Sequence, residues 1–176
     1  METWQDRKRW SDNFLIQIKR ILGEHFIGAA PVEEDRKRNT DLIVLKLDPL
    51  RFACRVRKAH FMKEYSGEFT IREKTPTGNK TEFTKIMEGW GDYLFYGFAD
   101  DEGLVCWRIG DLKVFRIAIL RHLSAKKAML GVQHTVPADS NVFRAFKWSE
   151  FPADFVVASN LLKGGHDATS PQLNYD

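Results

Sequence analysis

The chain has 176 residues, a formal net charge of +3 at pH 7 and a hydrophobic share of 43%. A chain of this length and composition forms one globular domain rather than a disordered segment. No stretch is long and apolar enough to span a bilayer, and no signal-peptide run follows the charged N-terminus. We therefore expect a cytoplasmic protein without membrane association, whose mild positive charge permits nucleic acid as a partner.

Cysteines, histidines and sequence motifs exclude several classes of site. Two cysteines, Cys54 and Cys106, are too few for a disulfide framework or a four-ligand zinc site, and their apolar surroundings predict buried free thiols. The histidines lack metal-ligand spacing. The chain has no phosphate-binding glycine loop, dinucleotide fingerprint or nucleophile elbow, which argues against nucleotide-hydrolysing, Rossmann-type and α/β-hydrolase enzymes.

The first half of the chain predicts one helix and three strands. Apolar residues at helical spacing indicate a helix from about Trp10 to Leu22, with Gly23 as its stop. A charged loop follows over residues 33–40. The strand candidates that come next cover residues 41–47, 51–57 and 68–72.

The second half predicts further helices and strands. Residues 81–88 form a short helix with one apolar face, and residues 93–98 form a strand that is apolar on both faces, as a buried central strand would be. A strand over 104–109 precedes a helix that begins at its N-cap, Asp111, and runs through Leu123. A last strand covers 143–148.

Strands and helices that alternate in this way predict a layered α/β or α+β fold with a small mixed sheet flanked by helices. We expect one domain over residues 1–160 and a flexible C-terminal tail over residues 161–176.

Alternation along the second strand gathers arginines on one face, because side chains two apart share a face. Like charges on one face repel each other unless acidic groups lie opposite. Asp41 opens the preceding strand and Glu68 opens the following one. One face of a three-stranded unit is therefore expected to combine Asp41 and Glu68 with Arg55, Arg57 and Arg72. Such a cluster is either a solvated salt-bridge network or a functional site.

The element order helix, strand, strand, strand, helix, strand resembles the core of the PD-(D/E)XK nuclease superfamily. The run Asn39-Thr-Asp-Leu-Ile-Val44 resembles its first motif, in which an aspartate at a strand edge binds a divalent metal. Residues 143–152 are similar to a closing strand and turn of some members. The resemblance spans residues 10–159 and implies a restriction-endonuclease-like core that acts on nucleic acid.

As implied by the resemblance, the protein would be a Mg²⁺-dependent endonuclease in which Asp41 and Glu68 hold the metal and Arg55 stabilises the phosphate. The carboxylate-X-lysine motif of the family is degenerate here, since Ala53 and Arg55 occupy its two positions. Alanine cannot bind a metal, and arginine stays protonated and cannot act as a base. Glu68 or Glu24 would have to replace the missing carboxylate. DNA and RNA both remain open as substrates.

Four further cations are candidates for contacting a nucleic-acid backbone: Arg57, Arg72, Lys80 and Lys85. The two lysines lie near a helix start, and their alternative interpretation is a solvated face. A second hypothesis is a catalytically inactive nuclease-fold binding protein, such as a phage or mobile-element accessory protein, that contacts nucleic acid or an acidic protein partner. Among the aromatic residues, Trp90 is the least expected in the core.

Overall fold

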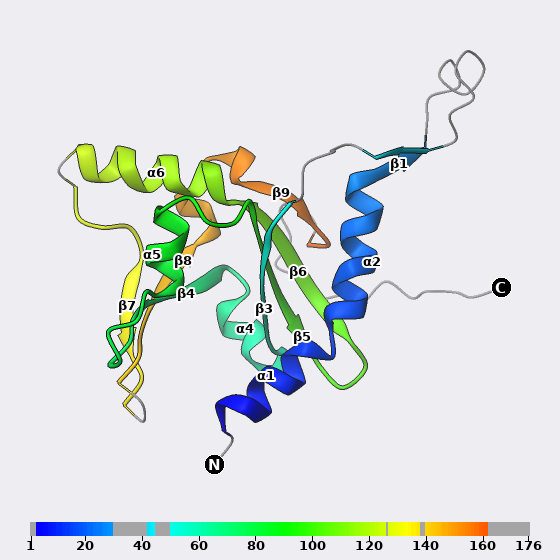
Figure 1. The fold of residues 1–176 in the computed structure, drawn as a ribbon, viewed down its shortest axis with the longest axis horizontal. Helices are drawn as coiled ribbons and strands as arrows, with labels where there is room; N and C mark the ends of the chain where they lie inside the picture. Colours follow the sequence, from blue (N-terminus) through cyan, green and yellow to red (C-terminus); the bar gives the residue numbers. More distant parts are fainter. Residues whose placement is uncertain (1–2, 30–41, 45–49, 126, 138–139, 162–176) are drawn as a thin grey trace.

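The computed structural model describes residues 3–29, 42–44, 50–125, 127–137 and 140–161 (Figure 1). In chain order the described elements are α1 (Trp4–Asp12), α2 (Leu15–Phe26), β1 (Ile27–Ala29), β2 (Leu42–Val44), β3 (Phe52–Lys58), η1 (Ala59–Phe61), α4 (Met62–Tyr65), β4 (Glu68–Lys74), α5 (Glu82–Met87), β5 (Tyr93–Ala99), β6 (Leu104–Asp111), α6 (Leu112–Ser124), β7 (Val132–Thr135), β8 (Val142–Lys147), η2 (Trp148–Glu150), η3 (Ala153–Phe155) and β9 (Val156–Ser159). Helices and strands of these lengths confirm the expected α+β class. The tail predicted for residues 161–176 lies, beyond Leu161, outside the described residues.

The described strands form a mixed four-stranded sheet in the order β3-β5-β6-β9, a three-stranded sheet in the order β4-β8-β7 and the pair β1-β2. In the larger sheet β3 runs parallel to β5, while β6 pairs antiparallel with β5 and β9. The strands expected in one small sheet are therefore divided between sheets, because β4 pairs with β8 instead of joining β3.

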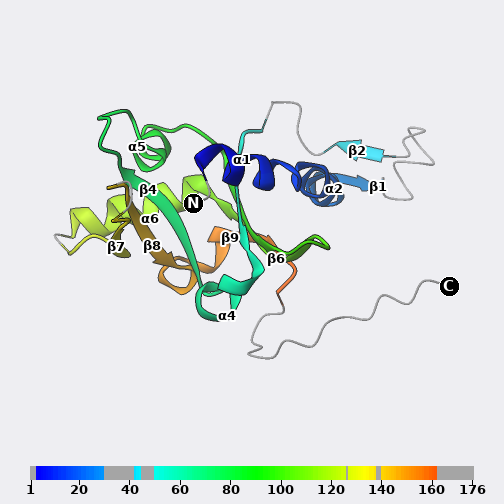
Figure 2. The same ribbon diagram turned by 90° about the horizontal axis from the view of Figure 1, so that it is seen from below.

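The two faces of the larger sheet are covered differently. Figure 2 shows α1 and α2 on one side, and the smaller sheet with α6 on the other. Phe95 and Ala99 of β5 pack against Ile18 of α2 and against Phe14, which immediately precedes α2. Leu94 and its neighbours on the opposite face of β5 belong to the main core. Residues 94–99 are all buried. The prediction of a central strand that is apolar on both faces is thus confirmed.

The N-terminal helical pattern is interrupted. Asn13 and Phe14 form a turn in which the Asn13 N–H donates to Trp10 O at 3.2 Å and the Phe14 N–H donates to Ser11 O at 3.2 Å. The apolar positions predicted for one helix still share one cluster, although α1 and α2 divide them. Gly23 does not end the helix, since α2 continues to Phe26. A glycine inside a helix costs only about 1 kcal/mol relative to alanine, which other residues of the helix can offset.

Helix caps begin two of the later helices, and the cap at Asp111 confirms the prediction. The Asp111 carboxylate accepts hydrogen bonds from the N–H groups of Lys113 and Val114 at 2.7 and 3.1 Å, so it is the N-cap of α6. Thr81 caps α5 by accepting from the Thr84 N–H. No helix among the described residues is both long and apolar enough to cross a membrane.

The expected three-stranded unit is not formed by the strands that the structure describes. β2 pairs with β1, β3 with β5 and β4 with β8. The alternation of side chains fixes which face of a strand is buried, but it carries no information on which strand lies alongside. Cys106 is a buried free thiol as predicted, whereas the prediction for Cys54 is wrong, since Cys54 is exposed on the end strand β3.

Candidate functional site

A cavity of about 690 Å³ lies between β3 and β4, which are end strands of their sheets among the described strands. We call this cavity the arginine groove. It is lined by Arg7, Lys8, Ser11, Asp12, Cys54, Arg55, Val56, Arg57, Tyr65, Glu68, Thr70, Arg72, His134, Val136, Phe143 and Ala145. Residues of α1, α4, β7 and β8 line the remainder of the groove.

The lining of the arginine groove is strongly basic. Five arginines and lysines stand against two carboxylates, whereas the whole chain carries only +3. One carboxylate, Asp12, is paired with Lys8 at 2.6 Å. A concave surface with one sign of charge concentrates its potential and attracts ligands of the opposite charge. The excess of cations in this lining therefore favours an anionic ligand over a cationic one.

Alternation places the predicted residues of β4 in this groove. Phe69 and Ile71 are fully buried in the core, so Glu68, Thr70 and Arg72 point to the other side. From the facing strand come Arg55 and Arg57. The structure thus brings four predicted site residues into one cavity, although their strands belong to different sheets.

Arg55 is held on several sides. Its Nη2 donates to Oε2 of Glu82 at 2.6 Å, and its Nη1 donates to the Thr70 hydroxyl at 3.2 Å. The guanidinium carbon also lies 5.4 Å from the centre of the Phe143 ring, within cation–π range. Because Glu82 balances its charge, Arg55 fixes the geometry of the groove more than it adds free positive charge.

Arg57 and Arg72 present charges without a carboxylate partner among the described residues. Arg57 lies over the rings of Phe61 and Tyr65, at 4.7 and 5.1 Å from their centres. Arg72 lies 5.4 Å from the centre of Phe143, and its Nε is buried without a hydrogen-bond partner in the described part of the chain. Stacking on aromatic rings orders a guanidinium group while leaving its terminal Nη groups for a ligand.

The carboxylates that a metal site would need are only partly gathered. Glu68 lines the groove, and its side chain makes no ion pair or hydrogen bond with the described residues. Glu24 pairs with Arg20 at 3.4 Å and is not part of the groove lining. Asp41 lies outside the described residues. Over the described ranges, no three His, Cys, Asp or Glu side chains form a group that could hold a metal ion.

A second cavity of about 540 Å³ adjoins the first, because Arg55 and Arg72 line both. We call it the lysine pocket. Its other charged or aromatic lining residues are Arg51, Phe52, Lys80, Glu82, Lys85 and Trp90. Lys80 is paired with Glu88 at 2.7 Å, and Lys85 is exposed on α5. The two predicted lysines thus lie beside the arginine groove and not within it.

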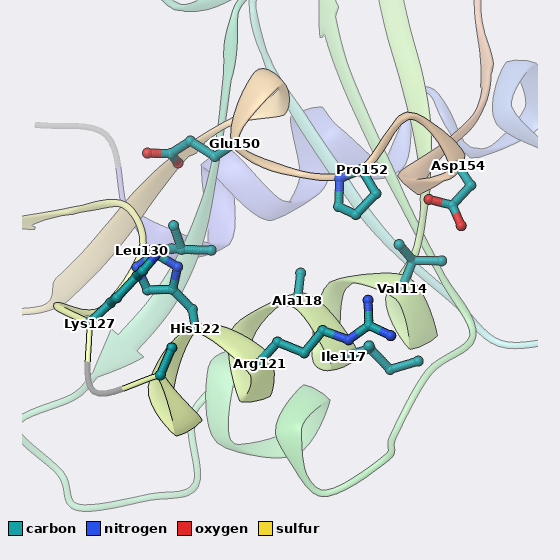
Figure 3. Close-up of a pocket in the computed structure, with 11 residues that line it drawn as sticks. Val114, Ile117, Ala118, Arg121, His122, Lys127, Leu130, Glu150, Pro152 and Asp154 are labelled. Atoms are coloured by element: carbon teal, nitrogen blue, oxygen red, sulfur yellow. The ribbon is translucent and has the colours of Figure 1, made fainter.

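A third cavity, of about 440 Å³, lies between α6 and the segment of η2 and η3 (Figure 3). Arg121 and His122 come from the helix, and Glu150 and Asp154 come from the opposite wall. Positive and negative groups balance across this cavity, and its floor is apolar. It is therefore a poor site for a polyanion.

Some residues of the groove are missed by the sequence pattern. Phe143 falls in a predicted strand, but nothing in the sequence places its ring against arginines from β3 and β4. Glu82 directly follows the N-cap of α5, where acidic residues are common because they stabilise the helix. The sequence therefore gives no sign that Glu82 binds Arg55. Arg7 and Lys8 form a visible basic cluster; in the fold Lys8 stays paired with Asp12, whereas Arg7 lines the groove without an ion-pair partner among the described residues.

Comparison with known proteins gives no further assignment: no family model, no curated protein and no solved structure matches the chain.

Proposed function

We propose that the protein binds nucleic acid through the arginine groove. The observation that carries this proposal is the pair Arg57 and Arg72, whose charges lack carboxylate partners among the described residues and which are oriented by aromatic rings. Arginine donors in a fixed geometry match the oxygens of a phosphodiester backbone. Arg7 extends the basic surface, while Lys8 and Arg55, which are paired with Asp12 and Glu82, fix its shape.

An acidic protein segment is the alternative partner for such a surface. The groove favours nucleic acid, because carboxylates on a peptide are irregularly spaced while phosphates repeat along a strand. Binding of nucleic acid is also recognisable by its salt dependence, since each neutralised phosphate releases counterions.

Replacing Arg57 and Arg72 together by glutamine is expected to weaken nucleic-acid binding about ten- to a hundredfold, since one phosphate contact is worth roughly 1 kcal/mol. The plot of log affinity against log salt should also become shallower by about 0.9 for each phosphate that is no longer neutralised. Fluorescence anisotropy with labelled DNA and RNA, single- and double-stranded, in EDTA measures both quantities.

Arg20→Gln is the matched control for this experiment. Arg20 is an exposed arginine of α2 outside the groove, paired with Glu24. Equal affinity and equal salt slope for the wild type and the double variant would contradict the proposal. If Arg20→Gln lowers the affinity as much as the double variant does, the effect comes from the net charge of the protein and not from the arginine groove.

A second candidate function is Mg²⁺-dependent cleavage of the bound strand, which the PD-(D/E)XK resemblance implies. The observation that favours it is the Glu68 carboxylate, which lies among the groove arginines without a partner in the described residues. The metal would be held by Asp41 and Glu68. Of these two ligands only Glu68 lies among the described residues, which form no metal-binding group and so define no catalytic step.

The cleavage function predicts that Asp41→Asn and Glu68→Gln each abolish Mg²⁺-dependent cutting of labelled DNA or RNA, while binding in EDTA persists. Gel analysis of the products, with both variants beside the wild type, checks this. Glu24→Gln is the control and should cut like the wild type. Wild-type protein that binds but does not cut with Mg²⁺ or Mn²⁺ would restrict the function to binding.

A further inference from the structure

Trp90 is a large apolar side chain that the core does not use. Its exposed fraction is 65%, whereas Trp148 is only 7% exposed. Tryptophan carries more apolar surface than other side chains, so leaving it in water forgoes a large gain from burial. No described ring is paired with it, which makes its face available to a ligand.

The loop that carries Trp90 is fixed on both sides. Gly89 and Gly91 adopt positive φ angles of 96° and 82°, which only glycine reaches without strain. The Trp90 N–H donates to Lys85 O at 3.0 Å, and Arg116 Nη1 donates to Gly91 O at 3.2 Å. The exposed indole is therefore held by a defined backbone rather than carried on a loose loop.

Asp92 connects the loop of Trp90 to Arg51, the residue just before β3. The Asp92 N–H donates to Arg51 O at 2.9 Å, and the Arg51 N–H donates to the Asp92 carboxylate at 2.8 Å. Arg51 immediately precedes β3, which carries Arg55 and Arg57. The hydrogen bonds between Asp92 and Arg51 therefore fix where Trp90 lies relative to β3 and the arginine groove.

The surroundings of Trp90 are cationic and polar. The lysine pocket places it with Arg51 and Lys85, and both of these side chains lack an ion-pair partner among the described residues. Thr75, Thr77 and Asn79 also line this pocket. An apolar protein surface would leave these charges buried and unpaired, whereas a nucleotide offers an aromatic base for the indole and a phosphate for the cations.

From this arrangement we infer that Trp90 stacks on an unpaired base of the bound nucleic acid. The inference rests on the proposed function and deepens it, because it names the substrate class as a single strand or a duplex with a single-stranded extension. Arg55 and Arg72 line both cavities, so one strand passes from the arginine groove to the lysine pocket without leaving the basic surface. Bases within a duplex are stacked on one another and cannot offer this face.

The test compares two oligomers of equal length, a thymidine oligonucleotide and an abasic one that keeps the phosphates but lacks the bases. Trp90→Ala is expected to bind the thymidine oligomer about tenfold more weakly than the wild type, because it loses the stacking contact with one base. Its affinity for the abasic oligomer should be unchanged. Trp90→Phe should recover most of the affinity, because it keeps an aromatic face.

The outcomes separate this inference from the function on which it rests. Equal affinity of the wild type and Trp90→Ala for the thymidine oligomer would overturn the inference and leave groove binding intact. A wild type that binds neither oligomer nor any duplex would instead overturn the proposed function, and the inference would fall with it. An equal decrease on both oligomers would show that Trp90 does not act through a base.

Discussion

Replacing Glu73 by glutamine is expected to lower the free energy of unfolding by about 3–5 kcal/mol, because it leaves a buried arginine without its counter-charge. Arg144 is 10% exposed at its side chain and Glu73 15%. Arg144 Nε and Nη2 donate to the two carboxylate oxygens at 2.9 and 3.0 Å, and Nη1 donates to the carbonyls of Leu130 and Gly131. Urea denaturation of the purified variant measures the change.

Glu88→Gln is the matched control, since the Lys80–Glu88 pair is exposed at the surface. Such a pair contributes about 0–1 kcal/mol, so this variant should unfold at nearly the wild-type urea concentration. Two variants of equal stability would show that the Glu73–Arg144 pair contributes no more than a surface pair.

The same carboxylate makes stability depend on pH. Burial alone would raise the pKa of Glu73, but hydrogen bonds from Arg144 and Gln133 and the charge of Arg144 outweigh it, and the pKa lies below the usual value. A lowered pKa in the folded state gives stability that is complete above the unfolded pKa of about 4.3. This contribution is lost as the pH falls through the lower, folded value. Glu73→Gln should remove that part of the acid dependence.

Replacing Phe69 by alanine should cost about 3–5 kcal/mol of unfolding free energy, the range for a buried phenylalanine removed from a tightly packed site. Phe69 is fully buried in β4, and the centre of its ring lies 4.5 Å from that of Trp148 and 5.4 Å from that of Phe146. Further rings surround it, namely Tyr96, Phe115, Phe151 and Phe155. These rings come from both sheets, α6 and the η2–η3 segment, so the cavity would loosen the contact between layers.

Phe61→Ala provides the comparison for Phe69→Ala, because Phe61 is 38% exposed on η1. Its removal should cost less than about 1 kcal/mol. Thermal unfolding of the two variants and the wild type measures both effects. A decrease of stability in Phe61→Ala as large as in Phe69→Ala would contradict the assignment of Phe69 to the centre of the core.

Local features of this fold can be predicted from the sequence because they depend on neighbours along the chain. The carboxylate of Asp111 needs only the next turn of helix to act as a cap, and β5 reveals its burial by being apolar at successive positions. The same holds for the groove-facing side of β4, which follows from strict alternation with Phe69 and Ile71.

Pairings between distant segments cannot be predicted in this way. Thr70 and Ala145 lie opposite each other in the β4–β8 ladder, and Arg55 and Tyr96 lie opposite each other in the parallel β3–β5 ladder. Neither pairing leaves a periodic signal. The sequence therefore predicts the charged residues of the candidate site but not its shape. The groove lies between β3 and β4, which belong to different sheets and do not pair.

The two strands that border the arginine groove also carry cations along the edges that no described strand covers. β3 and β4 are terminal strands of their sheets among the described strands, and such strands present unpaired backbone groups on which another chain can add a strand. Arg57 and Lys58 on β3, and Arg72 and Lys74 on β4, put like charges on both of these edges. A second copy that paired through the same edge would bring these like charges together, which disfavours such pairing.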